Sequence, residues 1–252
     1  MLRYLPLLFC VLSINLNALE CTSIRANGPN GWGAISQRNE NGALSGIAVE
    51  VAEKVFSQLA VKLKLGDILP WKRQQYYLET GEIDLVIAAY YNDDRAKIFS
   101  YSDPYHTDDI RVFVHKDRLF DFKNLHSLKG KLGLRPLGGT YGNQFDKFAV
   151  DHLNIEEYFY TEYGMKRLHS KRVDFLVLAL LDGLLTAKKY GISANIVPLP
   201  KNVTQLPIHF LLSNKSPCIK LLERINHILT ELKASHFIKN LEKKYLRQLN
   251  EF

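Results

Sequence analysis

The stretch that decides the fold of this chain is Gly81-Glu82-Ile83-Asp84-Leu85-Val86-Ile87-Ala88-Ala89-Tyr90-Tyr91-Asn92-Asp93-Asp94-Arg95. It reads as a glycine that ends a helix, then a buried strand, then a polar loop that closes on an arginine. The apolar run does not alternate with polar residues, which is typical of a strand covered on both faces of an α/β sheet. Ligands of such sheets bind beyond the carboxyl ends of the strands, where Tyr90, Asn92 and Arg95 fall.

Arg95 is the residue of this stretch with the clearest chemistry. A guanidinium beyond the end of a strand can hold a carboxylate through two parallel charge-assisted hydrogen bonds. The alternative is a solvated surface ion pair with Asp93 or Asp94, its close neighbours in the sequence. Spacing alone favours the two interpretations equally.

The rest of the chain alternates strand-like and helix-like runs, which predicts an α/β architecture. No internal repeat or low-complexity segment interrupts the pattern. The predicted strands cover residues 22–27, 62–68, 84–89, 110–114, 131–135, 175–179 and 206–212, and the predicted helices cover residues 50–59, 72–80, 143–151 and 217–246. Gly81 is expected to end the second of these helices.

Together with Ser102-Asp103-Pro104-Tyr105, the opening stretch resembles the family 3 periplasmic solute-binding proteins, the extracytoplasmic receptors of polar amino-acid ABC importers. Further matches follow in order over roughly residues 40–246. They are Gly46-Ile47-Ala48-Val49-Glu50-Val51-Ala52, Pro70-Trp71-Lys72-Arg73, Leu128-Lys129-Gly130-Lys131, Gly139-Thr140-Tyr141-Gly142 and Lys171-Arg172-Val173-Asp174, with Lys171 where the family usually has glycine. Each motif is weak alone, and their order and spacing carry the resemblance.

The resemblance implies a two-lobed periplasmic-binding-protein fold of the α/β class, with two crossover strands as its hinge. Lobe one is then expected to comprise residues 19–110 plus 212–252, lobe two residues 111–205, and the second hinge strand residues 206–211. In such a protein a small solute is held between the lobes without a cofactor. The implied partner is an inner-membrane ABC permease, and the protein is expected to be a monomer.

The resemblance also implies ligand-binding roles for residues near the end of the central strand. Arg95 matches the arginine that holds the ligand's α-carboxylate, and Ala88 and Tyr90 match positions that supply a backbone carbonyl and a hydroxyl. Tyr90 is bulkier than the usual threonine or serine. Its ring is therefore expected to shrink the pocket or stack on the ligand, while its hydroxyl stays free to form a hydrogen bond. Asn92 replaces a common threonine.

Two tryptophans and a glycine-rich turn complete the expected ligand site. Trp32 lies where the family often places an aromatic clamp, and it is equally suited to cover the core of lobe one. Trp71 is more typical of a core residue than of a clamp. Thr140 and Tyr141 lie in a turn before a helix, where free N–H groups and the helix dipole favour an anion.

One position departs from the family pattern. Family members that bind amino acids usually have an aspartate, which pairs with the ligand's ammonium, where this chain has Ala179. Asp182 would substitute only if the chain were offset, and Glu50 and Glu162 do not match the position. Burying an ammonium without an anion is costly. The solute is therefore an amino acid, a carboxylate without an α-amine, or a larger aromatic or peptide-like compound.

The start of the chain and its cysteines indicate an oxidising compartment. A positive residue, an apolar run and a small residue predict a signal peptide over residues 1–18 and a periplasmic protein, the alternative being an apolar first strand. Export would leave Cys21 and Cys218. A disulfide between them is the expectation, and two buried free thiols are the alternative.

Composition and spacing argue against other classes of protein. The net charge is +7, but the basic residues are interleaved with acidic ones along the chain, whereas a nucleic-acid-binding protein concentrates them on one face. The eight histidines lack the spacing of metal ligands. The leading hypothesis is a receptor that traps a small carboxylate-bearing solute by hinge closure. The alternatives are a soluble ligand-sensing module and a periplasmic dehydratase of cyclic acids, for which Glu162 and His169 are available as general acids.

Overall fold

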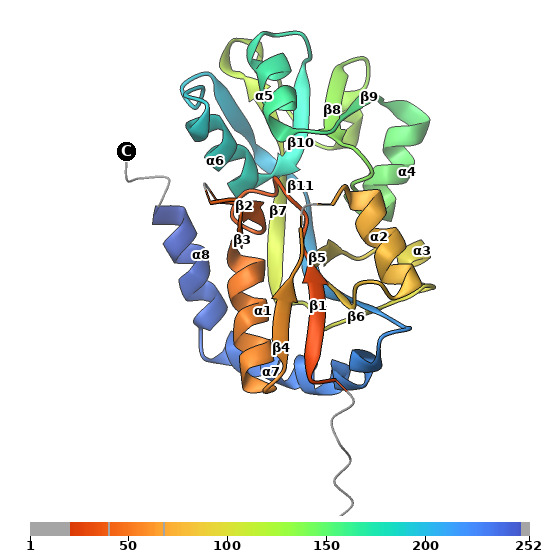
Figure 1. The fold of residues 1–252 in the computed structure, drawn as a ribbon. Helices are drawn as coiled ribbons and strands as arrows, with labels where there is room; N and C mark the ends of the chain where they lie inside the picture. The colour runs from red at the N-terminus through yellow and green to blue at the C-terminus, as the bar shows by residue number, and fades with distance from the viewer. Residues whose placement is uncertain (1–20, 40, 68, 248–252) are drawn as a thin grey trace, which may run out of the picture.

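The computed structural model of the chain describes residues 21–39, 41–67 and 69–247. They form two lobes of mixed α/β structure that share one continuous sheet (Figure 1). The predicted fold class is therefore confirmed. The predicted signal peptide over residues 1–18 lies outside the described residues.

Strands and helices alternate along the chain, as the sequence pattern predicted. The strands are β1 Ser23–Asn27, β2 Gln37–Arg38, β3 Leu44–Ser45, β4 Lys62–Leu65, β5 Leu85–Tyr90, β6 Phe99–Tyr101, β7 His106–His115, β8 Leu132–Pro136, β9 Asn154–Tyr158, β10 Phe175–Ala179 and β11 Ile196–Ser213. The α-helices are α1 Ile47–Gln58, α2 Trp71–Thr80, α3 Asp93–Ala96, α4 Asn143–His152, α5 Thr161–His169, α6 Leu180–Lys189, α7 Leu222–Ala234 and α8 Phe237–Arg247. The short 3₁₀ helices are η1 Lys116–Arg118, η2 Leu125–Leu128 and η3 Pro217–Leu221. Gly81 ends α2 with a left-handed φ of 83°, as predicted.

The main sheet explains how the two lobes are joined. Its strand order is β4-β1-β5-β11-β7-β10-β8-β9, and β6 pairs with β11. In one lobe β1 runs parallel to β4 and β5, and in the other β8 runs parallel to β9 and β10. Between these parallel blocks stand β7 and β11, which pair antiparallel with each other and pass from one lobe to the other (Figure 1). The predicted lobe boundaries fall near these strands and stay a prediction.

The sequence prediction did not include β2, β3, β6, β9, α3, α5 and α6, and it differs from the structure at the crossover strands and the C-terminal helix. The crossover strands are longer than their apolar runs, because pairing between β7 and β11 satisfies backbone groups on both sides of each run. The helix predicted over residues 217–246 is divided into η3, α7 and α8. His236 stands between the last two with a left-handed φ of 58°. The apolar stripe is interrupted at this point, because Leu232 and Phe237 are five residues apart, which is longer than the three or four of a continuous helix face.

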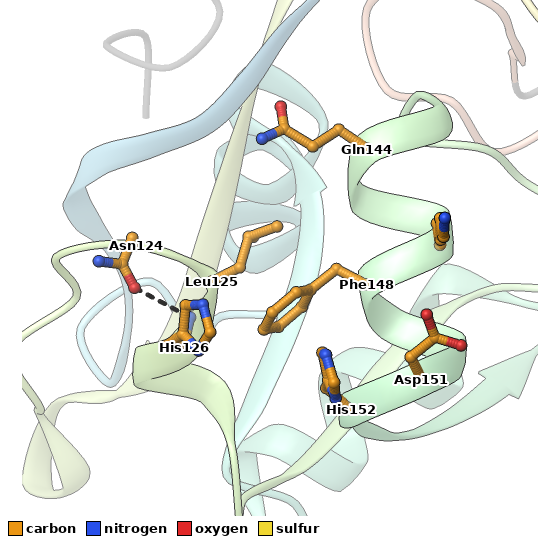
Figure 2. Close-up of a pocket in the computed structure, with 8 residues that line it drawn as sticks. Asn124, Leu125, His126, Gln144, Phe148, Asp151 and His152 are labelled. Atoms are coloured by element: carbon orange, nitrogen blue, oxygen red, sulfur yellow. Dashed lines mark hydrogen bonds between the residues drawn. The ribbon is translucent and has the colours of Figure 1, made fainter.

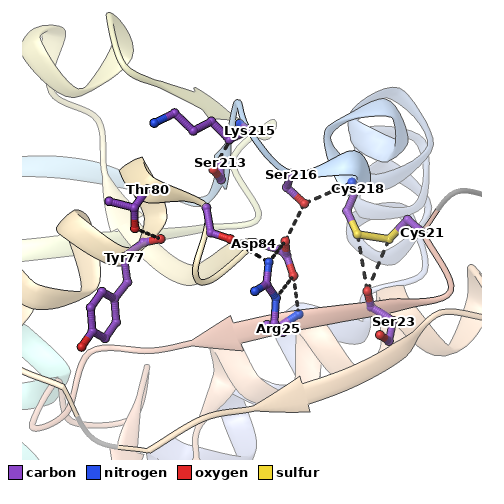
Figure 3. A network of polar contacts seen from close by, with 11 residues as sticks. Cys21, Ser23, Arg25, Tyr77, Thr80, Asp84, Ser213, Lys215, Ser216 and Cys218 are labelled. Atoms are coloured by element: carbon purple, nitrogen blue, oxygen red, sulfur yellow. Dashed lines mark hydrogen bonds and ion pairs between the residues drawn. A yellow bond between two sulfur atoms is a disulfide. The ribbon is translucent and has the colours of Figure 1, made fainter.

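Asp84 holds the start of the central strand β5 in place (Figure 3). Its buried carboxylate accepts hydrogen bonds from the Arg25 backbone N–H at 2.8 Å and from the Arg25 guanidinium at 2.9 Å through both Nε and Nη2. Ser216 Oγ donates to the same carboxylate at 2.7 Å. Burial alone would raise the pKa of Asp84, but these hydrogen bonds lower it. One carboxylate thus joins β1, β5 and the segment that leads into η3.

A disulfide between Cys21 and Cys218 lies beside this network and confirms the predicted pairing (Figure 3). It ties Cys21, two residues before β1, to Cys218 in η3, across a sequence separation of 197 residues. Ser216 links the disulfide to Asp84, because its hydroxyl oxygen accepts from the Cys218 N–H at 3.1 Å while the hydroxyl donates to Asp84. The start of the described chain and the segment that precedes the C-terminal helices are therefore anchored at one point of lobe one.

Lobe two repeats the arrangement with Asp174, which precedes β10. Asp174 Oδ2 accepts from the Leu132 N–H at 2.9 Å, and the Asp174 N–H donates to the Leu132 carbonyl at 2.8 Å. Asp84 makes the same two backbone contacts with Arg25. The settings differ, because the side chain of Asp174 is 40% exposed and that of Asp84 is 4% exposed.

We expect Asp84→Asn to lower the free energy of unfolding by about 3 kcal/mol near neutral pH, since it removes charge-assisted hydrogen bonds and leaves Arg25 without its anion. The pKa of Asp84 is lowered in the folded protein. Its contribution is therefore present above the ordinary value of 3.8 and is lost as the pH falls below it. Urea unfolding of both proteins across this range measures the difference. The control Asp174→Asn should cost about 1 kcal/mol or less, and equal losses would contradict the assignment.

Candidate functional site

The cleft between the lobes is closed, with loops of the two lobes in contact across it. Arg95 Nη2 donates a hydrogen bond to the Gly138 carbonyl of lobe two at 3.3 Å. Gly33 of lobe one lies against Asp182 so closely that a Cβ at position 33 would stand 2.5 Å from the Asp182 Cα. Gly33 also has a left-handed φ of 42°, so two constraints require glycine there. The candidate site lies in this cleft, where β5 and β10 end.

Asn92 and Arg95 follow β5 directly, and the two form one local unit. Asn92 is the N-cap of α3: its Oδ1 accepts from the N–H groups of Asp94 and Arg95, each at 3.1 Å. An asparagine in this position satisfies donors that a helix start would otherwise leave free. The structure therefore uses the Asn92 amide oxygen to hold the turn that carries Arg95.

The guanidinium of Arg95 forms its hydrogen bonds with neutral groups, and the charge of Asp146 acts on it from outside these contacts. Besides Gly138, it donates from Nε to Gln75 Oε1 at 3.2 Å and stands 5.0 Å from the ring centroid of Trp71. Burial lowers the pKa of Arg95, and a hydrogen bond with Tyr101 opposes this. Among the described residues no carboxylate forms an ion pair with it. A partly buried cation with only neutral acceptors attracts an anion.

The alternative partners of Arg95 considered from the sequence are engaged elsewhere. Asp94 pairs with Lys97 at 2.7 Å, and Asp93 accepts a hydrogen bond from the Asn143 side chain of lobe two. The predicted surface ion pair of Arg95 with either aspartate is therefore not found. Trp71 contributes a ring face beside the guanidinium rather than acting only as core.

Trp32 and Tyr90 form an aromatic wall of lobe one, and both donate to Asp108. The Trp32 indole Nε1–H reaches Asp108 Oδ2 at 2.9 Å, and the Tyr90 hydroxyl reaches the same oxygen at 2.6 Å. The two rings meet edge to face with centroids 4.6 Å apart. The expectation that the Tyr90 hydroxyl is free was wrong, because this hydroxyl donates its hydrogen bond to the buried carboxylate of Asp108. Ala88, two residues earlier, lies wholly buried in β5.

Sequence reasoning missed Asp108. It lies in β7 and is 5% exposed, and no motif marks it. The available signal was an acidic residue just after Pro104-Tyr105 and just before the apolar half of the hinge strand. Acids in such a position need donors, since a buried carboxylate without hydrogen bonds is costly.

From lobe two, Thr140 and Tyr141 reach the cleft through the turn before α4. The Thr140 hydroxyl and the Tyr141 N–H both contact the carboxylate of Asp146, which belongs to the first turn of α4. The Tyr141 hydroxyl donates to the Val177 carbonyl at 2.8 Å, and its ring lies 6.5 Å from that of Tyr90. The prediction of free N–H groups for an anion is thus wrong for Tyr141, because Asp146 already accepts from it.

Asp182 is the acid of lobe two that faces the cleft. Ala179 ends β10 as the N-cap of α6, and Asp182 follows in the first turn of that helix, 4% exposed. Burial raises the pKa of Asp182 to about 8, although hydrogen bonds from Thr186 and from the Gly33 N–H act to lower it. Asp182 is therefore largely protonated at neutral pH. The other acids considered lie elsewhere: Glu50 accepts from Lys244 and Tyr245 of α8.

Two hollows lie outside the contacts of Arg95. One, of about 390 Å³, is on lobe two, where Phe148 of α4 stands between His126 and His152 (Figure 2). The other, of about 430 Å³, lies beside the hinge and is lined by Tyr91, Gly142, Asn143, Leu206, Pro207 and His209.

Within the described ranges no group of three or more His, Cys, Asp or Glu residues could hold a metal. Nor is any helix of residues 21–247, masked positions aside, long and apolar enough to span a membrane.

Comparison with known proteins agrees with this architecture. The model of the bacterial extracellular solute-binding proteins, family 3, matches residues 30–248. The probable amino-acid-binding protein YxeM of Bacillus subtilis is 28% identical over 218 residues, which are 83% of this chain and 78% of that protein. The L-cystine-binding protein TcyJ of Escherichia coli K12 is 27% identical over 155 residues, 61% of this chain and 58% of that protein.

A solved structure of a ligand-bound protein has the same fold. An ancestral arginine-binding protein bound to arginine superposes with a TM-score of 0.74 at 25% identity, covering 89% of this chain and 98% of that one. This similarity concerns the arrangement of the two lobes. The chemistry that a solute would meet is set by this chain's own side chains around Arg95 and Asp108.

Asp182 should give the protein a pH dependence that asparagine would remove. Because its folded pKa of about 8 exceeds the ordinary 3.8, the stability it contributes is fully present below the lower value and is lost as the pH rises to the higher one. We expect the Tm to fall between pH 5 and 8, and to fall less in Asp182→Asn. Differential scanning calorimetry across this range is the measurement. In the control Asp174→Asn the Tm should fall with pH as steeply as in the unmodified protein. An equally steep fall in Asp182→Asn would refute the role of the Asp182 carboxyl.

Proposed function

Because the chain belongs to family 3 of the bacterial extracellular solute-binding proteins, we propose that it captures a small, carboxylate-bearing, amino-acid-like solute in the periplasm for an ABC importer. The guanidinium of Arg95 carries this proposal, since it is partly buried between the lobes with neutral partners only. A carboxylate would replace a bond to a neutral carbonyl by paired charge-assisted bonds. The names of the two relatives, amino-acid-binding and L-cystine-binding, support this class of solute.

The surroundings of Arg95 define how the solute lies. Its carboxylate binds Arg95 beside the ring of Trp71, and the rest of the molecule extends toward the wall of Trp32 and Tyr90. Tyr141 faces that wall from lobe two. Hinge motion of β7 and β11 opens and closes this space, and the closed form excludes water from the charged contact.

Asp182 supplies the anion that Ala179 lacks. In the closed cleft its carboxyl is largely neutral, which avoids the cost of a buried charge without a partner. An ammonium of the solute placed near Asp182 would favour the ionised form. A solute without an amine would leave the carboxyl protonated. The same cleft thus accepts both kinds of acid, with different proton balances.

This difference predicts proton release on binding an amine-bearing solute. At pH 7 Asp182 is mostly protonated, so pairing with an ammonium should expel up to one proton into the buffer. Isothermal titration calorimetry with L-arginine, L-cystine and L-glutamine, in two buffers of different ionisation enthalpy, measures the proton count. Asp182→Asn should release none. Equal proton release by both proteins would show that Asp182 is not the partner of the amine.

Removal of Arg95 tests the proposal directly. Arg95→Ala should abolish binding, because it deletes the cation that holds the carboxylate, and it should leave the protein folded. The measurement is mass spectrometry of small molecules released from the purified protein, together with thermal shift against amino acids and organic acids. A ligand at 100 times its Kd stabilises the folded form by about 2.7 kcal/mol, which a melting curve resolves. Arg224→Ala on the exposed face of α7 is the control, and unchanged binding in Arg95→Ala would overturn the proposal.

Turnover separates a receptor from a dehydratase on the same scaffold. Glu162, the first general acid considered, contacts Lys166 and accepts from the Tyr190 hydroxyl at 2.9 Å. These hydrogen bonds lower its pKa, opposite to what a general acid at neutral pH needs. The same bound-solute experiment should recover the solute chemically unchanged after long incubation.

A further inference from the structure

His106 is a buried histidine held between two carboxylates. It is the first residue of β7, and its side chain is 8% exposed. Nδ1 lies 2.8 Å from Glu242 Oε1 of α8, and Nε2 lies 3.4 Å from Asp108 Oδ1. An imidazolium has a donor on each nitrogen and therefore serves both acids at once, whereas neutral histidine serves only one.

Asp108 carries this contact into the cleft. One of its oxygens faces His106, and the other accepts from the Trp32 indole and the Tyr90 hydroxyl. A continuous line of polar contacts thus runs from Glu242 on the outer helix α8, through His106 and Asp108, to the aromatic wall. In Figure 1, α8 lies along the outside of lobe one, so this line crosses the lobe.

On the premise of the proposed solute-binding function, we propose that His106 is a positioning residue of the cleft, which orients Asp108 so that this carboxylate takes the donors of Trp32 and Tyr90. Trp32 and Tyr90 then present their ring faces, and not their indole and phenol donors, to the solute. The cleft therefore selects a carboxylate whose far end is apolar, flat or cationic over one whose far end carries hydrogen-bond acceptors.

The chemistry of the three groups explains why the charge on His106 matters. Without it, Asp108 and Glu242 lose the cation that they share. Asp108 is then free to turn away, and the indole and phenol donors are released toward the solute. Two other contacts hold α8 in place, because Lys244 and Tyr245 both donate to Glu50 of α1. The position of α8 and the orientation of Asp108 can therefore be tested separately.

The titration of His106 provides the readout. Burial lowers its pKa, but the hydrogen bonds and charges of Asp108 and Glu242 raise it to about 9. Among the described residues, the charged groups that act on this cluster are Asp108 on β7, Glu242 on α8, Lys239 acting on Glu242, and Asp182 acting on Tyr90 from lobe two. In the folded protein His106 is charged at pH values below about 9 and loses its charge as the pH rises through 9. The stability that this charge contributes is fully present below the ordinary 6.5 and is lost as the pH rises through 9.

The test follows Trp32 by ¹⁹F NMR in protein labelled with 5-fluorotryptophan. The chain has two tryptophans, and Trp32→Phe identifies the Trp32 signal. Asp182→Asn serves as background, so that this carboxyl does not titrate. We expect the Trp32 signal to shift with a midpoint near pH 9, set by the pKa of His106, while the Trp71 signal stays constant. A Trp32 signal that does not change with pH overturns the proposal, and this measurement needs no variant of His106.

Three variants separate positioning from general packing. His106→Gln should abolish the titration near pH 9, and Glu242→Gln should move it to lower pH, because one of the two carboxylates that raise the pKa of His106 is gone. Tyr245→Phe, which loosens α8 elsewhere, should retain the titration near pH 9. Persistence of the titration in His106→Gln would also overturn the proposal.

The binding experiment uses L-arginine, L-cystine and L-glutamine as probes. The Kd of each probe that binds the unmodified protein should change by about tenfold in His106→Gln, equivalent to about 1.4 kcal/mol, and not in the exposed His227→Ala. If no probe binds the unmodified protein while the Trp32 signal titrates as expected, the proposed function fails and the positioning role of His106 stands.

Discussion

The buried carboxylate of Asp84 sets the position of β5, the strand that brings Tyr90 and the turn of Arg95 to the cleft. It fixes the start of β5 against β1, and β5 then runs through six buried residues to Tyr90. Side chains alternate along a strand, so a slip of one residue would turn Tyr90 to the opposite face and displace the turn of Arg95 with it. The same carboxylate accepts hydrogen bonds from Arg25 and Ser216. It thereby joins the segment that leads into the C-terminal helices to β1 and β5. Asp174 aligns β10 and β8 in lobe two by the same backbone pairing.

Much of this architecture was predictable from the sequence because its determinants are local. A left-handed glycine at position 81, an unalternating apolar run over β5 and an arginine after it are signals that one segment carries by itself. The break between α7 and α8 was missed although the sequence carries a signal for it: the buried residues Leu232 and Ile238 lie six positions apart, where a continuous helix would repeat after three or four. The disulfide was inferred from two cysteines in a chain predicted to be exported. Its place beside Asp84 could not be predicted, because it depends on the packing of β1, β5 and η3 against one another.

The candidate site was predictable only in part, for a physical reason. Arg95, Trp32 and Tyr90 could be named from motifs, but the partners that decide their chemistry are distant in sequence. Asp108 takes the donors of both aromatics, and Asp146 takes the donors of the Thr140 turn. Buried donors and acceptors must be paired somewhere, and the fold chooses the partner. Residue type therefore indicated that these groups can form hydrogen bonds, while the structure shows that most of them already bond to partners within the protein.

The closed cleft already has contacts of its own, and these determine what a solute must offer. Arg95 donates to the Gly138 carbonyl, and Gly33 packs on Asp182. A solute favours the closed form only by as much as it binds that form better than the open one. A carboxylate meets this condition at Arg95, since charge-assisted bonds replace a bond to a neutral oxygen. An amine meets it at Asp182 by exchanging a buried proton for an ion pair. An uncharged solute would gain neither and would have to displace these contacts by apolar burial alone, so charge selects the solute before shape does.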